Sequence, residues 1–297
     1  MNSLLNNCQL CPKKCCINRN KGELGFCRAT NQLKIAKYSL HMWEEPCISG
    51  ETGSGTIFFS HCNLKCLFCQ NYHISTLNNG TEITINRFVD ICLELQSRKA
   101  SNINLVTPTH YVPLIVEGLK KAKKKGLTIP IVYNTSAYET VETIKLLEGL
   151  VDIYLPDLKY YDNRLAKKYS GIDNYFEYAQ KAIHEMYRQQ PICKFNELGQ
   201  MTKGIIVRHL LLPSLENDTK KILKYLHQTY HDNIYISIMN QYTPIRKLKY
   251  ENLNHQVSSK IYDEIIDYAW ELGIRHAFIQ EEGTQKEIFI PDFTKPI

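Results

Sequence analysis

Short apolar runs alternate with amphipathic segments along most of the chain from residue 56 onward. The apolar runs predict strands over residues 56–60, 103–106, 129–133, 152–155, 204–212 and 233–239. Apolar residues at helical spacing predict helices between them, over residues 86–99, 113–125, 140–149 and 174–188. Strands that alternate with helices form parallel sheets with right-handed crossovers. The pattern therefore predicts an α/β fold, a partial barrel of the (β/α)6 type.

Polar residues follow the ends of these strands, where a barrel of parallel strands places its active site. They are Thr107, Thr109 and His110, then Asn134, Thr135 and Ser136, then Asp157 and Lys159, and last Asn240 and Gln241. The fifth predicted strand carries Arg208 and His209 inside an apolar run, where a charge is costly unless it is paired. All are candidates for function, but Arg208 and Asp157 could instead form a structural ion pair, and both His110 and His209 could be structural.

Three cysteines lie at C-x3-C-x2-C spacing directly after the first predicted strand: Cys62, Cys66 and Cys69. Closely spaced cysteines on a loop can supply three thiolates to a four-iron cluster. Three protein ligands leave one iron open, and an open coordination position indicates chemistry at the metal. A Cys3His zinc site completed by His61 or His73 is the alternative for this spacing.

The first fifty residues contain a second group of cysteines, and the loop that carries it is rich in polar and basic residues. Cys8, Cys11, Cys15 and Cys27 are spaced as ligands of one metal site, and Cys16 could replace Cys15. Four thiolates can hold zinc or an auxiliary iron–sulfur cluster, either of which would stabilise a segment with so little core. We therefore expect a cysteine-rich, metal-binding segment over residues 1–50 and a barrel domain over residues 51–297.

Composition and charge limit the classes of function. The cysteines number eleven, an odd number, and most of them lie in two groups, which suits metal binding in a reducing compartment better than disulfides. No run is long enough to cross a bilayer and the polar start is unlike a signal peptide, so we expect a cytoplasmic protein without membrane contact. The net charge is +6, but its densest basic run, residues 120–125, ends a predicted helix, where cations are favoured. A non-catalytic metal module with a basic nucleic-acid-binding surface is the competing hypothesis.

The cysteine loop, with Phe68 as the aromatic residue before Cys69, resembles the signature of radical S-adenosylmethionine (SAM) enzymes. Residues 44–50 (EEPCISG), 53–56 (GSGT) and 69–72 (CQNY) more closely resemble a branch related to pyruvate formate-lyase activating enzymes, the PflX-like iron–sulfur proteins. The resemblance implies a [4Fe-4S] cluster on Cys62, Cys66 and Cys69 whose open iron is chelated by SAM. It also implies a one-electron reductant of the flavodoxin or ferredoxin type.

In the family that this chain resembles, reductive cleavage of SAM gives a 5′-deoxyadenosyl radical that abstracts a hydrogen atom. Activating enzymes take this atom from a glycine of a partner enzyme. For this chain, the substrate could also be a different protein or a small molecule. We also expect the segment between the fourth and fifth predicted strands, residues 171–203, to cover the active site.

The resemblance also suggests contacts to SAM. Residues 107–109, with Thr107 and Thr109, stand where the activating enzymes have Gly-Gly-Glu. The resemblance therefore does not say which group contacts the SAM amino group; a threonine hydroxyl or a backbone carbonyl could do so. Asp157 and Lys159 match the family's Asp-Leu-Lys segment near the methionine end of SAM, and Asn134 and Thr135 match its Asp-Thr pair in part. The remaining implied contacts are to adenine from Phe68 and Gln70, and to the carboxylate or ribose of SAM from Arg208 or His209.

Overall fold

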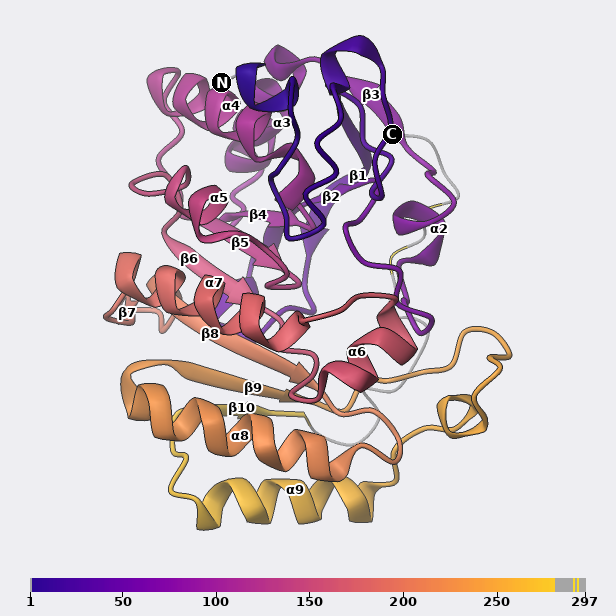
Figure 1. The fold of residues 1–297 in the computed structure, drawn as a ribbon. Helices are drawn as coiled ribbons and strands as arrows, with labels where there is room; N and C mark the ends of the chain where they lie inside the picture. Colours follow the sequence, from indigo (N-terminus) through magenta and orange to yellow (C-terminus); the bar gives the residue numbers. More distant parts are fainter. Residues whose placement is uncertain (1, 281–290, 292, 294–297) are drawn as a thin grey trace.

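A ten-stranded, mostly parallel sheet forms the centre of the protein (Figure 1). The structure is a computed structural model that describes residues 2–280, 291 and 293. The strand order is β10-β9-β8-β6-β5-β4-β2-β1-β3, and β7 pairs with β8 outside this path. β3 and β10 stand at the two ends of the path, so the described strands form an open barrel. The predicted α/β fold is confirmed.

The parallel part of the sheet contains all six predicted strands. Its strands are β2 (Ser54–Phe59), β4 (Ile103–Val106), β5 (Ile131–Thr135), β6 (Ile153–Pro156), β8 (Met201–Leu210), β9 (Tyr235–Met239) and β10 (Ala277–Ile279). Every residue of β2, β4, β5 and β6 is buried. Burial on both faces explains why these strands are near-continuous apolar runs in the sequence.

Two antiparallel strands extend the sheet beyond β2. β1 (Leu33–His41) pairs with β2, and the short β3 (Thr81–Ile83) pairs with the start of β1. Residues 33–41 therefore belong to the sheet, although they fall within the expected N-terminal segment of residues 1–50. Most of the last part of the expected barrel domain, residues 281–297, lies outside the described residues.

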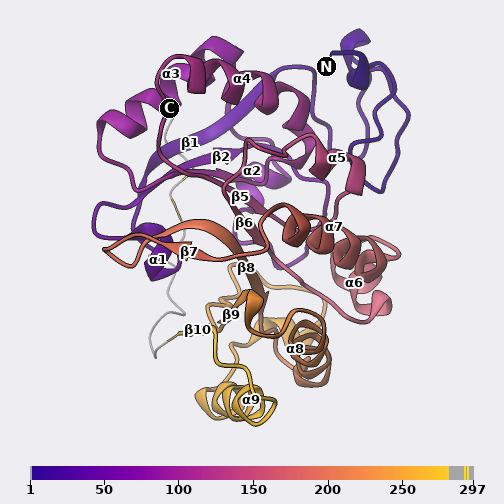
Figure 2. The same cartoon turned by 90° about the vertical axis from the view of Figure 1, so that its left-hand side faces the viewer.

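Helices cover the outer, convex side of the curved sheet (Figure 2). They are α3 (Ile85–Ser97), α4 (Val112–Lys124), α5 (Val141–Lys145), α6 (Asn163–Ser170), α7 (Tyr175–Gln189), α8 (Glu216–Tyr230) and α9 (Ser259–Glu271), with single turns at α1 (Pro46–Ser49) and α2 (Tyr72–Ser75). The 3-10 turns are η1 (Asn2–Leu5), η2 (Arg19–Lys21), η3 (Thr109–Tyr111), η4 (His231–Asn233) and η5 (Glu251–Asn254). The side chain of Thr84 caps α3 by accepting from the amide of Arg87. No helix among the described residues combines the length and apolar character needed to span a membrane.

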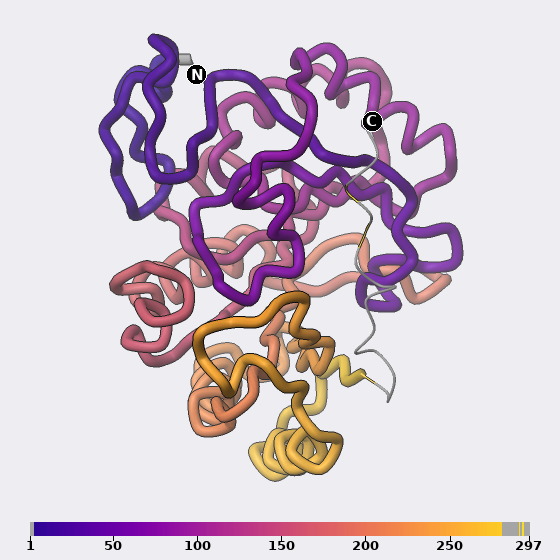
Figure 3. Tube along the Cα trace, turned by 90° about the vertical axis from the view of Figure 1, so that its right-hand side faces the viewer, coloured from indigo at the N-terminus to yellow at the C-terminus, as the bar shows by residue number. Residues whose placement is uncertain are grey.

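The cysteine-rich N-terminal coil, residues 2–32, lies against one flank of the barrel (Figure 3). Leu5 and Leu10 are buried and join the main hydrophobic core. The hydroxyl of Thr143 on α5 donates to the carbonyl of Leu10 at 2.8 Å. These contacts fix a segment that otherwise contributes little apolar surface.

The hairpin before β8 lies far from the place that we expected for it. β7 (Lys194–Phe195) pairs antiparallel with the first residues of β8. The side chain of Gln200 bonds Ser101 Oγ at 3.1 Å, and Ser101 precedes β4. Both contacts are at the amino ends of the parallel strands, whereas a barrel site lies at their carboxyl ends. The prediction that this part of residues 171–203 covers the site is wrong.

Candidate functional site

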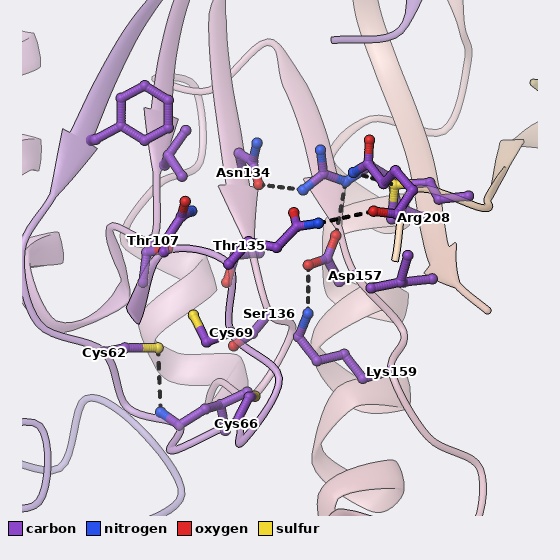
Figure 4. A pocket seen from close by; sticks show the side chains of 18 of the residues that line it. Cys62, Cys66, Cys69, Thr107, Asn134, Thr135, Ser136, Asp157, Lys159 and Arg208 are labelled. Carbon is purple, nitrogen blue, oxygen red and sulfur yellow. Dashed lines mark hydrogen bonds and ion pairs between the residues drawn. The ribbon is translucent and has the colours of Figure 1, made fainter. Parts of the chain in front are cut away.

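A cavity of about 290 Å³ opens at the carboxyl ends of the parallel strands. All three cysteines of the loop after β2 line it. The opposite wall consists of residues at or just after the ends of β4, β5, β6 and β8 (Figure 4): Thr107, Asn134, Thr135, Ser136, Asp157, Lys159 and Arg208. The sequence placed most of these residues in one site, and the structure brings them together.

Hydrogen bonds hold the cysteine loop to its neighbours. The buried amide of Asn63 donates to the carbonyl of Tyr138 at 2.7 Å. The backbone amides of Lys65 and Leu67 donate to the last carbonyls of α6, those of Ser170 and Tyr169, at 3.2 and 2.9 Å. These helix-end carbonyls have no partner within the helix, so the loop satisfies them while it is fixed in place.

Each of the three thiols has a polar neighbour. The amide of Leu64 lies 3.4 Å from Cys62 Sγ, Ser170 Oγ donates to Cys66 Sγ at 2.9 Å, and Ser75 Oγ lies 3.4 Å from Cys69 Sγ. Donors of this kind stabilise the thiolates that hold an iron–sulfur cluster and tune its potential.

Without a metal, the environment of the loop favours the protonated thiols of Cys62 and Cys66. Burial and the neighbouring thiols raise the pKa of Cys62 to about 12. Burial also raises the pKa of Cys66, to about 11. A thiol binds metal only as its thiolate. These cysteines would therefore release their protons when a positively charged metal group binds.

The histidines considered as zinc ligands face elsewhere. Neither His61 nor His73, which belongs to α2, lines the cavity of the three thiols. The His61 ring instead packs edge-on to His110, with ring centres 6.3 Å apart. The three thiols and their donors thus fit a cluster with one open position better than a closed Cys3His site.

Arg208 organises the charged wall of the cavity. Its Nε donates to Asp157 Oδ1 at 2.8 Å, its Nη1 to Glu44 Oε2 at 3.1 Å and its Nη2 to Asn134 Oδ1 at 2.7 Å. Lys159 Nζ donates to Asp157 Oδ2 at 2.7 Å. Burial opposes the charge on Asp157, but Arg208 and Lys159 outweigh it and hold the pKa of this carboxyl below its usual value. The alternative of an Arg208–Asp157 ion pair is therefore confirmed.

Glu44 is a cavity residue that our site prediction missed. It lies between β1 and α1, and its second oxygen accepts from Asn104 on β4 at 2.9 Å. Burial raises its pKa, although Arg208 opposes this shift. The Glu44-Glu45-Pro46 motif is visible in the sequence, but its position in the fold is not. β1, which ends just before this motif, pairs with β2, and this pairing places Glu44 near Arg208. Ser136 was noted at a strand end but not included in the predicted site, and its buried hydroxyl has no partner among the described residues.

The remaining predicted residues divide into two groups. Phe68 and Gln70 line the cavity, and the side chain of Gln70 donates to the carbonyl of Gln241 at 2.9 Å. Thr109 does not line the cavity, since its buried hydroxyl lies 3.3 Å from that of Thr135 and supports it from behind.

His209 faces away from the cavity, which corrects our prediction that it contacts SAM. Its Nδ1 lies 2.7 Å from the carbonyl of Leu158 and its Nε2 lies 2.9 Å from Thr219 Oγ1 on α8. Successive residues of a strand point to opposite faces, so Arg208 and His209 cannot both reach the cavity. His209 is thus a structural histidine.

A buried carboxyl group supports the cavity wall at the end of β5. Glu139 accepts from the hydroxyl of Tyr133 at 2.8 Å and from that of Thr135. Burial raises the pKa of Glu139 to about 7, despite these hydrogen bonds. Its protonation therefore changes near neutral pH, next to a residue that lines the cavity.

The four N-terminal cysteines Cys8, Cys11, Cys15 and Cys27 line a second cavity, of about 20 Å³. Cys15 lines this cavity, whereas the exposed Cys16 donates instead to the carbonyl of Lys14 at 3.3 Å. Burial raises the pKa of Cys11 to about 12. Over the described ranges, no three His, Cys, Asp or Glu side chains are gathered as they would be around one metal ion. The thiols of either cysteine group would therefore have to move closer together in order to bind one metal centre.

Comparisons with known proteins agree with this architecture. Residues 56–199 match the family model of the radical SAM superfamily. An uncharacterized protein of Methanocaldococcus jannaschii is 32% identical over 273 residues, which cover 89% of this chain and 73% of the relative.

Solved structures share the fold at low sequence identity. Streptococcus suis SuiB bound to S-adenosylmethionine has a TM-score of 0.51 at 13% identity, over 75% of this chain and 49% of that chain. The FeFe-hydrogenase maturase HydG of Carboxydothermus hydrogenoformans has a TM-score of 0.52 at 12% identity, over 77% of this chain and 54% of that chain. The chain thus spans about half the length of these two structures. From the family model and the cysteine loop within it, we conclude that this chain belongs to the radical SAM superfamily.

Proposed function

We propose that this protein is a radical SAM enzyme that binds a [4Fe-4S] cluster through Cys62, Cys66 and Cys69 and cleaves SAM reductively. The observation that carries the proposal is that the three thiols share one cavity with a wall of polar and charged side chains. When bound and reduced, the cluster supplies one electron to SAM, which gives methionine and a 5′-deoxyadenosyl radical that takes a hydrogen atom from the substrate.

The polar wall would hold SAM by its methionine end and its ribose. Thr107, Asn134, Thr135 and Lys159 present hydroxyl, amide and ammonium groups to the cavity, and the unpartnered hydroxyl of Ser136 lies among them. These groups can donate to a carboxylate, and their hydroxyl and amide oxygens can accept from an amino group. Phe68 and Gln70 are our candidates for the adenine contact.

Arg208 has a different role in this proposal. All three of its guanidinium nitrogens already bind acceptors of the protein. We therefore assign it the positioning of Asp157 and Glu44 rather than direct contact with SAM. Asp157 in turn fixes the ammonium group of Lys159.

The resemblance of residues 44–50 and 69–72 to a branch related to pyruvate formate-lyase activating enzymes supports a finer proposal. The substrate would be a glycine of a partner glycyl radical enzyme, and the electron would come from a reductant of the flavodoxin or ferredoxin type. A different protein or a small molecule is the other substrate class that fits. Cys8, Cys11, Cys15 and Cys27 would hold zinc or a second iron–sulfur cluster.

The proposal is tested by the cluster and its response to SAM. Anaerobically reconstituted protein should show the electron paramagnetic resonance (EPR) signal of a reduced [4Fe-4S] cluster, and this signal should change when SAM is added. The triple Cys62→Ala, Cys66→Ala, Cys69→Ala variant should lose the SAM-responsive signal. Cys92→Ala, at a buried cysteine of α3 that lines neither cavity, should keep it. A SAM-responsive signal in the triple variant would overturn the ligand assignment.

A further inference from the structure

Arg19 places a buried positive charge at the N-terminal cysteine cavity. It lies on η2, is 1% exposed and lines the cavity together with the four thiols. Its Nε donates to the carbonyl of Thr30 at 3.0 Å and its Nη1 to the carbonyl of His110 at 2.6 Å. Within the described part of the chain it forms no ion pair with a carboxylate. The ring of Tyr111 also lies beside it, with its centre 5.8 Å from the guanidinium carbon. A charge buried against neutral carbonyls and a neutral ring is costly, so the site calls for a negative partner.

A metal centre on the four thiols supplies that partner. Four thiolates around zinc, or around the core of a [4Fe-4S] cluster, carry a net charge of about −2, because the metal group itself contributes about +2. The guanidinium of Arg19, which lines the same cavity as the four thiols, then lies next to an anion. Arg19 and the thiols therefore form a complementary set only when a metal is bound.

His110 connects this centre to the barrel. It lies on η3, shortly after β4, and lines the N-terminal cavity. Its Nε2 lies 2.8 Å from the carbonyl of Ser60, so Nε2 carries the proton, and its Nδ1 is buried without a partner among the described residues. Ser60 stands two residues before Cys62 in the chain. Arg19 shares the cavity of the N-terminal thiols, and hydrogen bonds run from Arg19 through His110 to Ser60, at the start of the loop of the second cysteine group.

We propose that Cys8, Cys11, Cys15 and Cys27 bind a thiophilic metal centre as thiolates with Arg19 as its counter-charge, and that Arg19 and His110 couple the loading of this centre to the order of the cysteine loop at residues 60–69. The second half rests on the function proposed above, because it makes the N-terminal centre a support of the SAM site. The first half stands independently of that function.

Metal binding is measured in the Cys62/Cys66/Cys69 triple alanine background, where the barrel site cannot contribute. Zinc and iron are quantified after anaerobic expression, and the identity of the retained metal distinguishes a zinc site from an iron–sulfur cluster. Adding Cys15→Ser should remove the metal. Adding Cys16→Ser, at the exposed neighbour, should leave it in place. Equal loss in the two variants, or no loss in either, would overturn the ligand set.

The counter-charge is tested in the same background. Arg19→Met should weaken metal binding by about 10- to 100-fold, as the loss of an outer partner of a metal site typically does. Arg19→Lys keeps the charge and should restore most of the affinity. Circular dichroism of each variant reports whether the fold is retained. Unchanged metal affinity in a folded Arg19→Met protein would refute the role of Arg19.

Coupling to the barrel is read by hydrogen exchange, which needs no activity. In the triple alanine background, amides of residues 60–67 should exchange more slowly in metal-loaded protein than in protein stripped by a chelator. The difference should shrink in Arg19→Met protein loaded to the same extent. Identical exchange with and without the metal would refute the coupling, because it would show that the N-terminal centre orders only its own segment and not the loop of residues 60–69. Because neither readout requires SAM chemistry, a negative result here is distinguishable from a failure of the proposed enzyme function.

Discussion

Arg208 joins three separate elements at the cavity wall. Glu44 precedes α1, Asn134 lies on β5 and Asp157 follows β6, and each accepts one hydrogen bond from the guanidinium. The planar fork of an arginine holds such partners at fixed angles, which a lysine could not do. At the scale of single residues, the shape of the site therefore depends on one side chain.

Arg208→Met should lower the free energy of unfolding by about 3–5 kcal/mol, because it leaves the largely buried carboxylates of Asp157 and Glu44, which are 17% and 9% exposed, without their main counter-charge. Urea unfolding followed by circular dichroism measures the change. Arg188→Met is the matched control: this arginine of α7 also pairs with two carboxylates, Glu148 and Glu185, but its side chain is 49% exposed. Its loss should lower the free energy of unfolding much less, because an exposed ion pair contributes little to stability. Equal losses in the two variants would contradict the central place of Arg208.

Glu139 predicts a pH dependence of stability. Its pKa is about 7 in the folded protein against 4.5 for the unperturbed group. An acid with a raised folded-state pKa contributes fully below its unfolded pKa, and the contribution is lost as the pH rises toward the folded value. Between pH 4.5 and 7 the wild type should therefore lose about 3 kcal/mol relative to Glu139→Gln, whose amide mimics the protonated acid. Parallel stability curves for the two proteins would rule out this assignment.

At the scale of elements, burial decides what the sequence predicts. The central strands β4, β5 and β6 are buried on both faces and appear as apolar runs, so their positions were predicted to within two residues. β1 has buried residues only near its start, at Leu33, Ile35 and Ala36, and its remaining residues are half-buried. β3 and β10 have three residues each. None of these strands was predicted. Such strands are defined by their partners more than by their own residues.

The site residues divide in the same way, into those recognisable from their local sequence and those placed by a distant pairing. Cys62, Cys66 and Cys69 were predicted from their local spacing, and Asp157 and Lys159 from their position after a recognisable strand. Glu44 could not be assigned, because its approach to Arg208 depends on the unpredicted strand β1.

The cysteine loop gives a prediction at this scale. Asn63→Leu keeps a similar volume but removes the donor to the carbonyl of Tyr138. Loss of this buried bond should lower the free energy of unfolding by about 1–3 kcal/mol and loosen the loop. Iron retained after gel filtration of reconstituted protein should fall relative to wild type. Full iron retention together with an unchanged unfolding midpoint would mean that the loop does not depend on this anchor.

At the scale of the whole molecule, both cysteine groups lie on the same side of the fold. The loop after β2 and the coil of residues 2–32 meet at His110, which bonds to the carbonyl of Ser60 and lines the N-terminal cavity. The strand β4 that precedes His110 also leads into Thr107 at the large cavity. One end of the barrel thus carries both candidate metal sites, while the β7 hairpin lies at the other end.

The most direct test of the central claim is the formation of 5′-deoxyadenosine from SAM by anaerobically reconstituted, dithionite-reduced protein. The account predicts product from the wild type and from Cys92→Ala, and none from the Cys62/Cys66/Cys69 triple alanine variant. Product from the triple variant, or no product from a wild type whose loaded cluster fails to respond to SAM, would contradict it.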